Sequence, residues 1–190
     1  MKVTAGNSDI VNGCLKGDKD AFRQLYHKHH PWMMGICMRY CSNRDEAKDV
    51  LQECLIRVFN AIGSFTYQGD AQFVSWLKRI VVNTSLSYLR QQSKENFIPL
   101  DDGTPLSLVA EEPADYSEAE ELPQEKLLGM ISELPAGYRA VFNMYVFEEM
   151  SHREIAQELG ISENTSKTQL LKARAFLKNK ISKTVKSFTI

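Results

Sequence analysis

The sequence predicts an all-α protein: two small helical domains joined by an acidic flexible linker, the C-terminal one a four-helix helix-turn-helix domain. Apolar residues recur at spacings of three and four over most of the chain. Residues 94–123 interrupt that pattern with prolines, glycine and acidic residues. Residues 151–178 read as two helices separated by a glycine. We therefore expect domains at residues 1–93 and 124–190.

The overall charge of -1 hides an uneven distribution. Residues 1–93 contain 12 Lys or Arg and 8 Asp or Glu, residues 94–125 contain 1 and 10, and residues 150–190 contain 8 and 3. Two mildly basic domains thus flank an acidic connector. Because phosphate neutralisation drives non-specific DNA affinity, such modest charge predicts weak DNA binding by the free chain. A larger partner would have to supply the remaining DNA affinity.

The composition, 43% apolar and 25% charged residues, is typical of a globular protein. No apolar run reaches membrane-spanning length, and the first residues lack the apolar segment of a signal peptide. A cytoplasmic location is therefore expected.

Three helices are expected at the N-terminal end, over residues 9–16, 21–30 and 32–41. Pro31 is expected to interrupt the second and third, because the residue before a proline is biased away from helical angles. Methionines and aromatic residues in these segments are interpreted as core rather than as ligands.

The segment 43–65 is predicted to be a core helix, opened by a possible capping box of Asn43 and Glu46. Its apolar residues recur at helical spacing, and Phe59 is counted among them. Its solvent side brings Asp49, Gln52 and Glu53 close together. Such a cluster is either a solvated face or a docking surface, and the residues alone leave both open.

A loop over residues 64–72 leads into a helix over residues 73–92. Trp76 belongs to its apolar stripe, and polar or basic residues stand beside the stripe: Lys78, Arg79, Asn83 and Arg90. Aromatic rings beside cations suit stacking on unpaired bases. An equal alternative places Trp76 in the core and leaves the basic residues merely solvated.

Cys37 and Cys41, with three histidines shortly upstream, make a metal site conceivable. No CxxC pair occurs, and cysteine is a common small core residue, so no metal is predicted. The chain also lacks a Ser-His-Asp or Cys-His arrangement at usable spacing and a glycine-rich phosphate loop. We therefore expect no enzyme activity, no cofactor and no small-molecule substrate.

The C-terminal domain is expected to begin with helices over residues 124–135 and 137–150. Ser151 and Glu154 then form a capping box for the first helix of the helix-turn-helix, which Gly160 ends. Ser162 caps the second helix. The basic tail, residues 182–190, is expected to fray.

The second helix has an inward face of Ser166, Leu170, Ala173 and Leu177. Amide, hydroxyl and charged side chains remain for the other sides, which are the types that contact base edges and phosphates in a major groove. The residues predicted to line those sides are Glu163, Asn164, Thr165, Lys167, Thr168, Gln169 and Lys172. An ordinary helical hairpin with a solvated face is the alternative for this segment considered alone.

Four segments, in their order, resemble a known family: DAFRQLY, DEAKDVLQECLIRVF, FVSWLKRIVVNTSLSYLR and ELPAGYRAVFNMYVFEEMSHREIAQELGISENTSKTQLLKARAFL. They resemble bacterial RNA polymerase sigma factors of the extracytoplasmic-function (ECF) type in the sigma-70 family. The resemblance covers nearly the whole chain. It implies core RNA polymerase and promoter DNA as partners, together with an anti-sigma factor, which in some members is anchored in a membrane.

The resemblance also implies roles for the candidate residues. The surface around Asp49, Gln52 and Glu53 would dock on the coiled coil of the largest polymerase subunit. The loop 65–72 and the helix with Trp76, Lys78, Arg79, Asn83 and Arg90 would take the minus-ten element, with one base flipped from the stack. The second helix of the helix-turn-helix would read the minus-thirty-five element as duplex.

The chain departs from the pattern of this family in two places. Ser87 stands where an aspartate is frequent, with Gln91 and Gln92 where a run of basic residues is frequent, and Ser166 stands where a branched apolar residue is usual. We expect the Ser166 hydroxyl to bond back to the Ser162 carbonyl. Two alternative functions remain: a stand-alone helix-turn-helix transcriptional regulator, and a sigma-like decoy that sequesters an anti-sigma protein.

Overall fold

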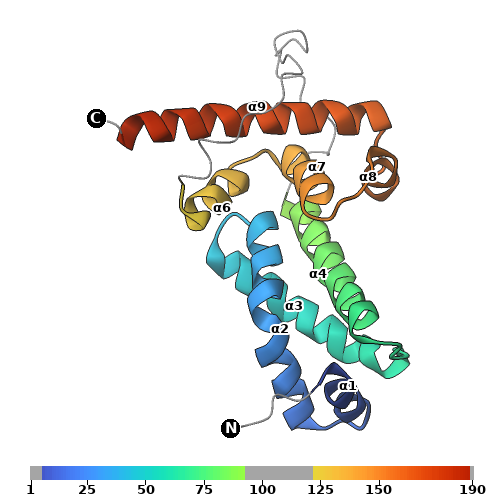
Figure 1. Cartoon of the computed structure of the whole chain (residues 1–190). Coiled ribbons are helices and arrows are strands. Elements are labelled where there is room, and N and C mark those ends of the chain that lie inside the picture. The colour runs from blue at the N-terminus through green and yellow to red at the C-terminus, as the bar shows by residue number, and fades with distance from the viewer. Residues whose placement is uncertain (1–5, 93–121, 189–190) are drawn as a thin grey trace. The chain divides into compact units, whose positions relative to one another are not determined.

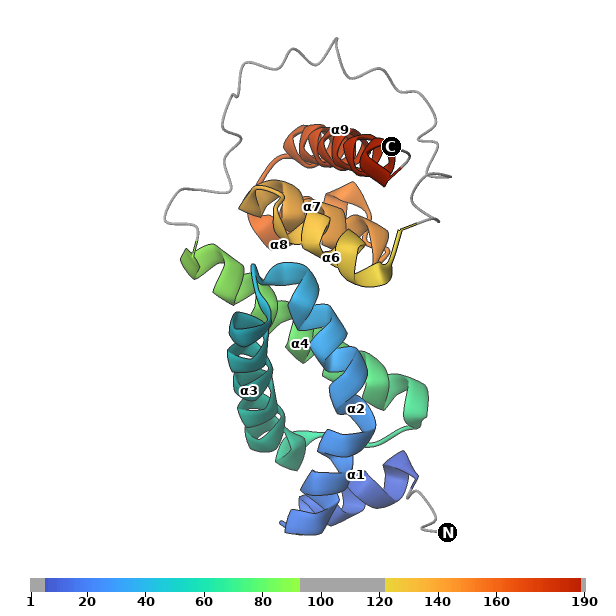
Figure 2. The same cartoon turned by 90° about the vertical axis from the view of Figure 1, so that its left-hand side faces the viewer.

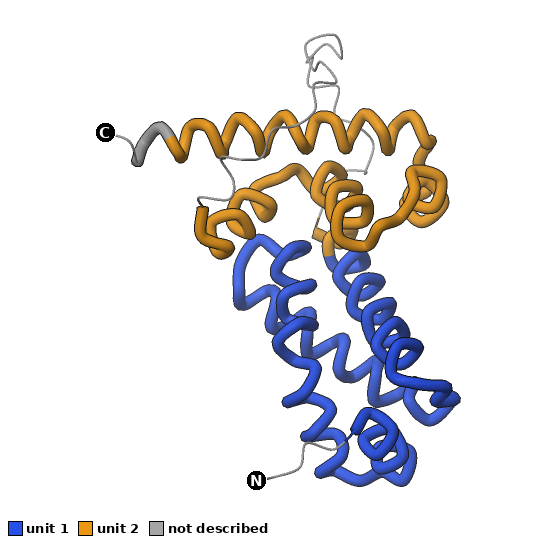
Figure 3. The backbone as a smooth tube through the Cα atoms, viewed as in Figure 1, with its two compact units in different colours: residues 1–88 blue, residues 89–190 orange. Residues whose placement is uncertain are grey.

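The computed structural model describes residues 6–92 and 122–188, with side chains as far as Val185. Within these ranges the regular structure is helical and no strand occurs, which confirms the all-α prediction (Figure 1). The chain divides into two compact units, Met1–Tyr88 and Leu89–Ile190 (Figure 3). The predicted linker 94–123 lies outside the described residues except for Leu122 and Pro123.

The first unit contains the helices α1 (Asn7–Leu15), α2 (Lys19–Tyr40), α3 (Arg44–Ala61) and most of α4 (Asp70–Gln92), which continues past Tyr88, with the short 3-10 helix η1 (Ile62–Ser64) after α3. Helix α1 packs across the N-terminal end of α2, as Figures 1 and 2 show. All five elements contribute to one apolar core. Its buried members are Ile10, Val11, Cys14, Ala21, Leu25, Val58, Ile62, Phe73 and Leu77.

Side chains cap α2 and α3, and for α3 this was predicted. The Asp18 carboxylate accepts a hydrogen bond from the Asp20 backbone N–H at 2.9 Å. Asn43 accepts from the backbone N–H groups of Asp45 and Glu46. The Glu46 carboxylate then accepts from the Ser42 N–H at 2.9 Å. In this capping box Glu46 therefore accepts from the backbone N–H of Ser42, one residue before the predicted partner Asn43.

Pro31 does not interrupt the helix, which corrects the prediction. Helix α2 runs continuously from Lys19 to Tyr40 with Pro31 inside it. A proline leaves the carbonyl four residues earlier, here that of His27, without its helical donor. Both Pro31 and His27 are exposed, so water can hydrate that carbonyl.

The second unit contains α6 (Gln124–Ser132), α7 (Ala136–Val146), α8 (His152–Leu159) and α9 (Glu163–Phe188). Helix α9 runs along α6 and α7, with α8 near its N-terminal end (Figures 1 and 2). The capping box of Ser151 and Glu154 is present, and Gly160 has a φ of 67°, so both predictions are confirmed. The tail prediction is wrong, because α9 continues to Phe188.

The predicted apolar stripes are not wholly buried. Of the residues predicted in the stripes, Phe59 on α3 is 59% exposed and Tyr26 on α2 is 38% exposed. Ile56 on α3, which was not placed in the stripe, is 48% exposed. Phe59 directly follows the buried Val58, and one residue turns a helix by about 100°, which carries it out of the core. No helix in residues 6–92 or 122–188 is long and apolar enough to cross a membrane.

Candidate functional site

The acidic and amide cluster on α3 is an exposed face. Asp49, Gln52 and Glu53 are all exposed and lie on one side of the helix, because their spacings are three and four residues. The Glu53 carboxylate pairs with the Arg57 guanidinium at 2.9 Å, on the same helix. Asp49 is exposed and therefore accessible to a partner.

An apolar groove of about 450 Å³ adjoins this face, between α2 and α3. Phe22 of α2 and Phe59 of α3 meet across it, with ring centroids 4.7 Å apart. Gln52 lines its edge, so the polar face and the groove are continuous. The groove was not predicted because these aromatic residues were expected in the core. The signal available was that Phe59 lies one residue past the buried Val58, and that Ile56 lies almost opposite the buried stripe, on the side of Asp49 and Gln52.

The loop before α4 is held in shape by its own side chains. The Tyr67 hydroxyl donates to Asp70, and the Gln68 backbone N–H donates to Gln72 Oε1 at 3.1 Å. Gly69 has a φ of 135°, a conformation that side-chain-bearing residues rarely adopt. The loop therefore presents one defined conformation next to α4.

Trp76 stands between core and surface. Its ring centroid lies 4.6 Å from that of Phe65 and 5.9 Å from that of Phe73, and Phe73 is fully buried. Trp76 itself is only partly buried. The aromatic cluster thus continues from the core to the surface, where further ring stacking is sterically possible.

The polar residues of α4 do not all share one flank. Arg79, Asn83 and Arg90 are exposed and lie within one arc that includes Trp76, at helical offsets of three, seven and fourteen residues. Lys78 is rotated from Trp76 by about 200° and lies on another side. The Ser87 hydroxyl donates to the Asn83 carbonyl at 2.9 Å, so this departure from the family pattern is satisfied within the helix.

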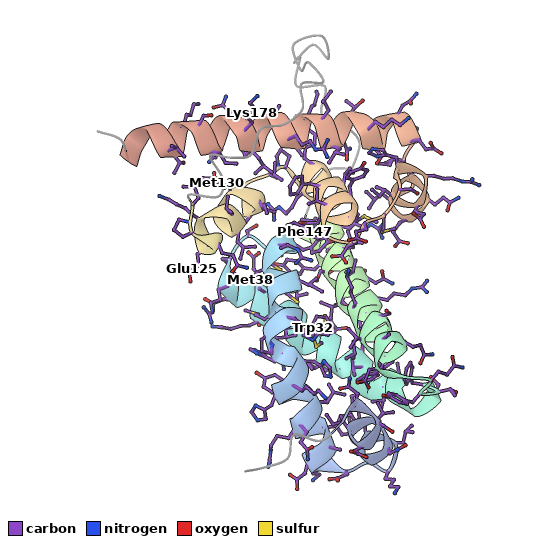
Figure 4. All side chains as sticks on the ribbon, viewed as in Figure 1. Trp32, Met38, Glu125, Met130, Phe147 and Lys178 are labelled. Atoms are coloured by element: carbon purple, nitrogen blue, oxygen red, sulfur yellow. The ribbon has the colours of Figure 1, made fainter. Side chains whose placement is uncertain are left out.

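Five of the seven residues that were predicted to line the outward sides of α9 are exposed or partly exposed. Glu163, Asn164 and Lys167 are exposed, and Thr165 and Thr168 are partly exposed. Thr165 is also part of the cap, since its N–H donates to Ser162 Oγ at 3.0 Å. The face continues to Lys178, which is exposed on the outer side of α9 (Figure 4).

The other two residues correct the prediction of an outward position. Gln169 is 1% exposed and Lys172 is 9% exposed. Gln169 follows the inward Ser166 by three residues, so it shares the inner side of the helix. Its side-chain amide packs on α7, where a Cβ added at Gly137 would lie 3.2 Å from it. Helical spacing from Ser166 was the signal that could have placed Gln169 correctly.

Ser166 also bonds differently from the expectation. It is 0% exposed, and its hydroxyl lies 2.9 Å from Nδ1 of His152, the first residue of α8. The Ser162 carbonyl accepts instead from the Ser166 backbone N–H at 3.0 Å. Burial, together with the nearby charges of Lys167 and Arg174, lowers the pKa of His152 below its ordinary value.

The cysteines and His29 of the first unit are buried. All four cysteines are free and buried, and no group of three His, Cys, Asp or Glu side chains in the described ranges is arranged to hold a metal ion. His29 is 3% exposed and sits between Asn7 Oδ1 at 3.2 Å and the Trp32 indole N–H at 3.1 Å (Figure 4 labels Trp32). Burial lowers the pKa of His29.

Comparison with known proteins assigns both units. Residues 25–95 match sigma-70 region 2, and residues 124–177 match sigma-70 region 4. The ECF RNA polymerase sigma factor SigM of Mycobacterium tuberculosis is 31% identical over 171 residues, covering 90% of this chain and 82% of SigM. The RNA polymerase sigma-H factor of Pseudomonas aeruginosa is 28% identical over 189 residues, covering 92% of this chain and 93% of that protein.

Among solved structures, the sigma factor RpoE from Bartonella quintana, crystallised with the anti-sigma factor NepR, is similar to this chain. The match has 23% identity and a TM-score of 0.49, and covers 83% of this chain and 94% of that one. The two region matches and the SigM identity define the class. The chain belongs to the ECF type of the sigma-70 family and is an alternative sigma factor that directs promoter recognition and transcription initiation.

Proposed function

We propose that this sigma factor binds core RNA polymerase through the α3 face and the adjoining groove. The α3 face supplies charged and amide groups, Asp49, Gln52 and Glu53, that set orientation. The groove supplies exposed apolar area at Ile56 and Phe59, which is the kind of surface that carries binding energy. The continuity of these two surfaces at Gln52, inside the region 2 match, is the observation that carries the proposal.

The same unit takes the minus-ten element in this proposal. The fixed loop 65–69 and the partly exposed Trp76 offer aromatic surface for an unpaired base. Arg79, Asn83 and Arg90 on the same flank face the phosphates, while Lys78 reaches the strand from another side. Stacking of this kind contributes about 1–3 kcal/mol per base, so a few bases offset local duplex opening.

The second unit reads the minus-thirty-five element as duplex. Asn164, Lys167 and Thr168 form the part of α9 that enters the major groove, with Glu163 and Thr165 at its N-terminal edge. Gln169 and Lys172, being buried, support the helix from behind rather than contact bases. Polymerase performs the chemistry, and the chain contributes recognition.

Reconstituted transcription tests the proposal. Purified core polymerase, genomic DNA fragments and the chain are combined, and run-off transcripts are measured with each component left out in turn. We expect transcripts only when core and chain are both present. A stand-alone regulator would instead bind a specific duplex without core. A decoy would bind an anti-sigma protein and give no transcript.

We further propose that an anti-sigma protein, free or membrane-anchored, holds the chain inactive. Membership of the ECF type is the support for this partner. The expected behaviour is loss of chain-dependent transcription when the purified partner is added, with no effect on transcription by a different holoenzyme. A candidate that leaves chain-dependent transcripts unchanged would be rejected as that partner.

A further inference from the structure

A polar contact joins the two helices of the helix-turn-helix inside the second unit. His152 is the first residue of α8, and its Nδ1 lies 2.9 Å from the hydroxyl of Ser166 on α9. Ser166 is fully buried on the inward face of α9. A buried hydroxyl needs a hydrogen-bond partner, and His152 is the partner that the structure provides. The contact therefore links the position of α9 to that of α8.

The His152 ring is held by a third helix as well. It stacks on Tyr145 of α7, with ring centroids 4.8 Å apart and an angle of 25° between the planes. The Arg174 guanidinium carbon of α9 lies 5.6 Å from the centre of the same tyrosine ring. The imidazole thus contacts α7 and α9 while it belongs to α8, so neither its position nor its rotation is free.

We propose that His152 is a positioning residue for duplex recognition, which holds α9 at a fixed angle to α8 through Ser166 and takes up a proton when α9 engages DNA. This inference rests on the proposed reading of the minus-thirty-five element by α9. His152 would thus contribute to duplex recognition although it is not one of the α9 residues predicted to contact DNA.

Burial is the main influence on the protonation of the ring in the free chain, because it lowers the pKa of His152, and the charges around the ring act in addition. Lys167 and Arg174 of α9 disfavour a positive imidazole, Glu163 of α9 favours it, and α7 presents the neutral Tyr145. The start of α8 adds the positive end of a helix dipole. The lowered pKa favours the neutral ring near pH 7. We take its tautomer to be the one in which Nδ1 accepts the Ser166 hydroxyl hydrogen.

Proton uptake preserves the hydrogen bond between His152 and Ser166 but exchanges its donor and acceptor. Nδ1 takes a proton from water and donates to Ser166 Oγ, and the hydroxyl hydrogen turns to a helix carbonyl four residues back, that of Ser162. In a bound helix-turn-helix, the first helix crosses the phosphate backbone. Phosphates then approach the start of α8 and Lys167, and their negative charge favours the imidazolium.

The sign of the pH effect follows by linkage. Because the proton binds more tightly in the complex than in the free chain, duplex affinity rises as pH falls through the interval between the two midpoints. One proton allows a slope of at most about one decade of affinity per pH unit. Above and below that interval the His152 contribution is constant.

The test uses holoenzyme assembled from core polymerase and the full chain, and a promoter duplex that the wild type transcribes. Affinity is measured by fluorescence anisotropy between about pH 8 and pH 6, the range in which histidines titrate. His152→Asn keeps an acceptor near Nδ1 but carries no titrating proton, and His152→Ala keeps neither. The matched control is His27→Asn, a histidine exposed on α2.

We expect His152→Asn to bind within about two-fold of wild type at the upper pH, and to lose the rise in affinity at lower pH. His152→Ala should bind roughly five-fold or more weakly at every pH, and adding Ser166→Ala to it should change little, because the two residues act as one unit. His27→Asn should retain the wild-type profile.

Equal pH profiles for wild type and His152→Asn would overturn the proton uptake. Equal affinity of His152→Ala and wild type at the upper pH would overturn the positioning role. Should His152→Ala unfold, Ser166→Ala replaces it, with the same expected loss. A wild-type holoenzyme that does not bind or transcribe the duplex would overturn the proposed function itself, an outcome separate from the first two.

Discussion

Truncating Phe59 tests the groove between α2 and α3 as a docking surface. A phenylalanine side chain offers roughly 200 Å² of surface. With 59% of Phe59 exposed, about 120 Å² is available to a partner. At ~25 cal/mol per Å² this amounts to about 3 kcal/mol if fully covered, and Phe59→Ala retains the Cβ. We therefore expect core affinity to fall by about 2–3 kcal/mol, or roughly 30- to 140-fold.

The assay is competition, in which unlabelled variants displace N-terminally labelled wild-type chain from core polymerase. Leu15→Ala is the matched control, because Leu15 is 46% exposed on α1 and does not line the groove. Thermal melts show whether loss of the Phe22–Phe59 contact unfolds the chain, in which case Ile56→Ala is used instead. A change in affinity below about three-fold in a folded variant would refute the groove as a major contributor to core binding.

Further predictions concern DNA contact, backbone geometry and pH. Lys167→Ala should weaken promoter duplex binding by the holoenzyme and reduce the salt slope by about one, and equal slopes would argue against a phosphate contact there. Glu149 has a φ of 55°, so Glu149→Gly should stabilise the second unit by about 0.5–1 kcal/mol in urea unfolding. A Cβ at Gly13 would lie 2.5 Å from the Ala21 Cβ, so Gly13→Ala should lower the melting temperature; an unchanged value would show that α1 can shift. The pKa of His29 is lowered from 6.5, so its contribution to stability is present above pH 6.5 and is lost as pH falls through the folded-state value. An NMR midpoint for His29 at or above 6.5 would contradict this.

Helical spacing predicted the fold well because most of these helices bury one stripe. The capping box at Ser151 and the turn at Gly160 were predicted correctly, since both depend on residues adjacent in sequence. The predicted break at Pro31 was wrong because the free energy of a carbonyl that loses its helical donor depends on whether water can reach it, and Pro31 and His27 are exposed. An exposed carbonyl can be hydrated, and spacing alone does not report exposure.

The candidate site was predictable where a residue's side of its helix was unambiguous. Asp49, Gln52 and Lys167 lie far from the buried stripe and are exposed as expected. Gln169 and Phe59 lie at the edge of a stripe, where contacts with a neighbouring helix decide burial. The polar character of Gln169 favoured the surface, but close packing on Gly137 placed it inside.

The contact between His152 and Ser166 could not be predicted from the sequence for a related reason. The residues are fourteen positions apart on different helices, and only the turn between those helices brings them to 2.9 Å. A serine among apolar positions did signal an unusual inward face. It did not identify the partner, because a helix carbonyl was equally able to accept the bond.

The central claim is that the chain positions polymerase through two DNA-reading surfaces and one core-binding surface. Mapping the 5′ ends of all transcripts made from genomic DNA by core polymerase, with and without the chain, tests it most directly. We expect start sites that require the chain, that share two upstream sequence blocks at a constant spacing, and that disappear with Phe59→Ala at limiting core concentration. An identical set of start sites with and without the chain would contradict it.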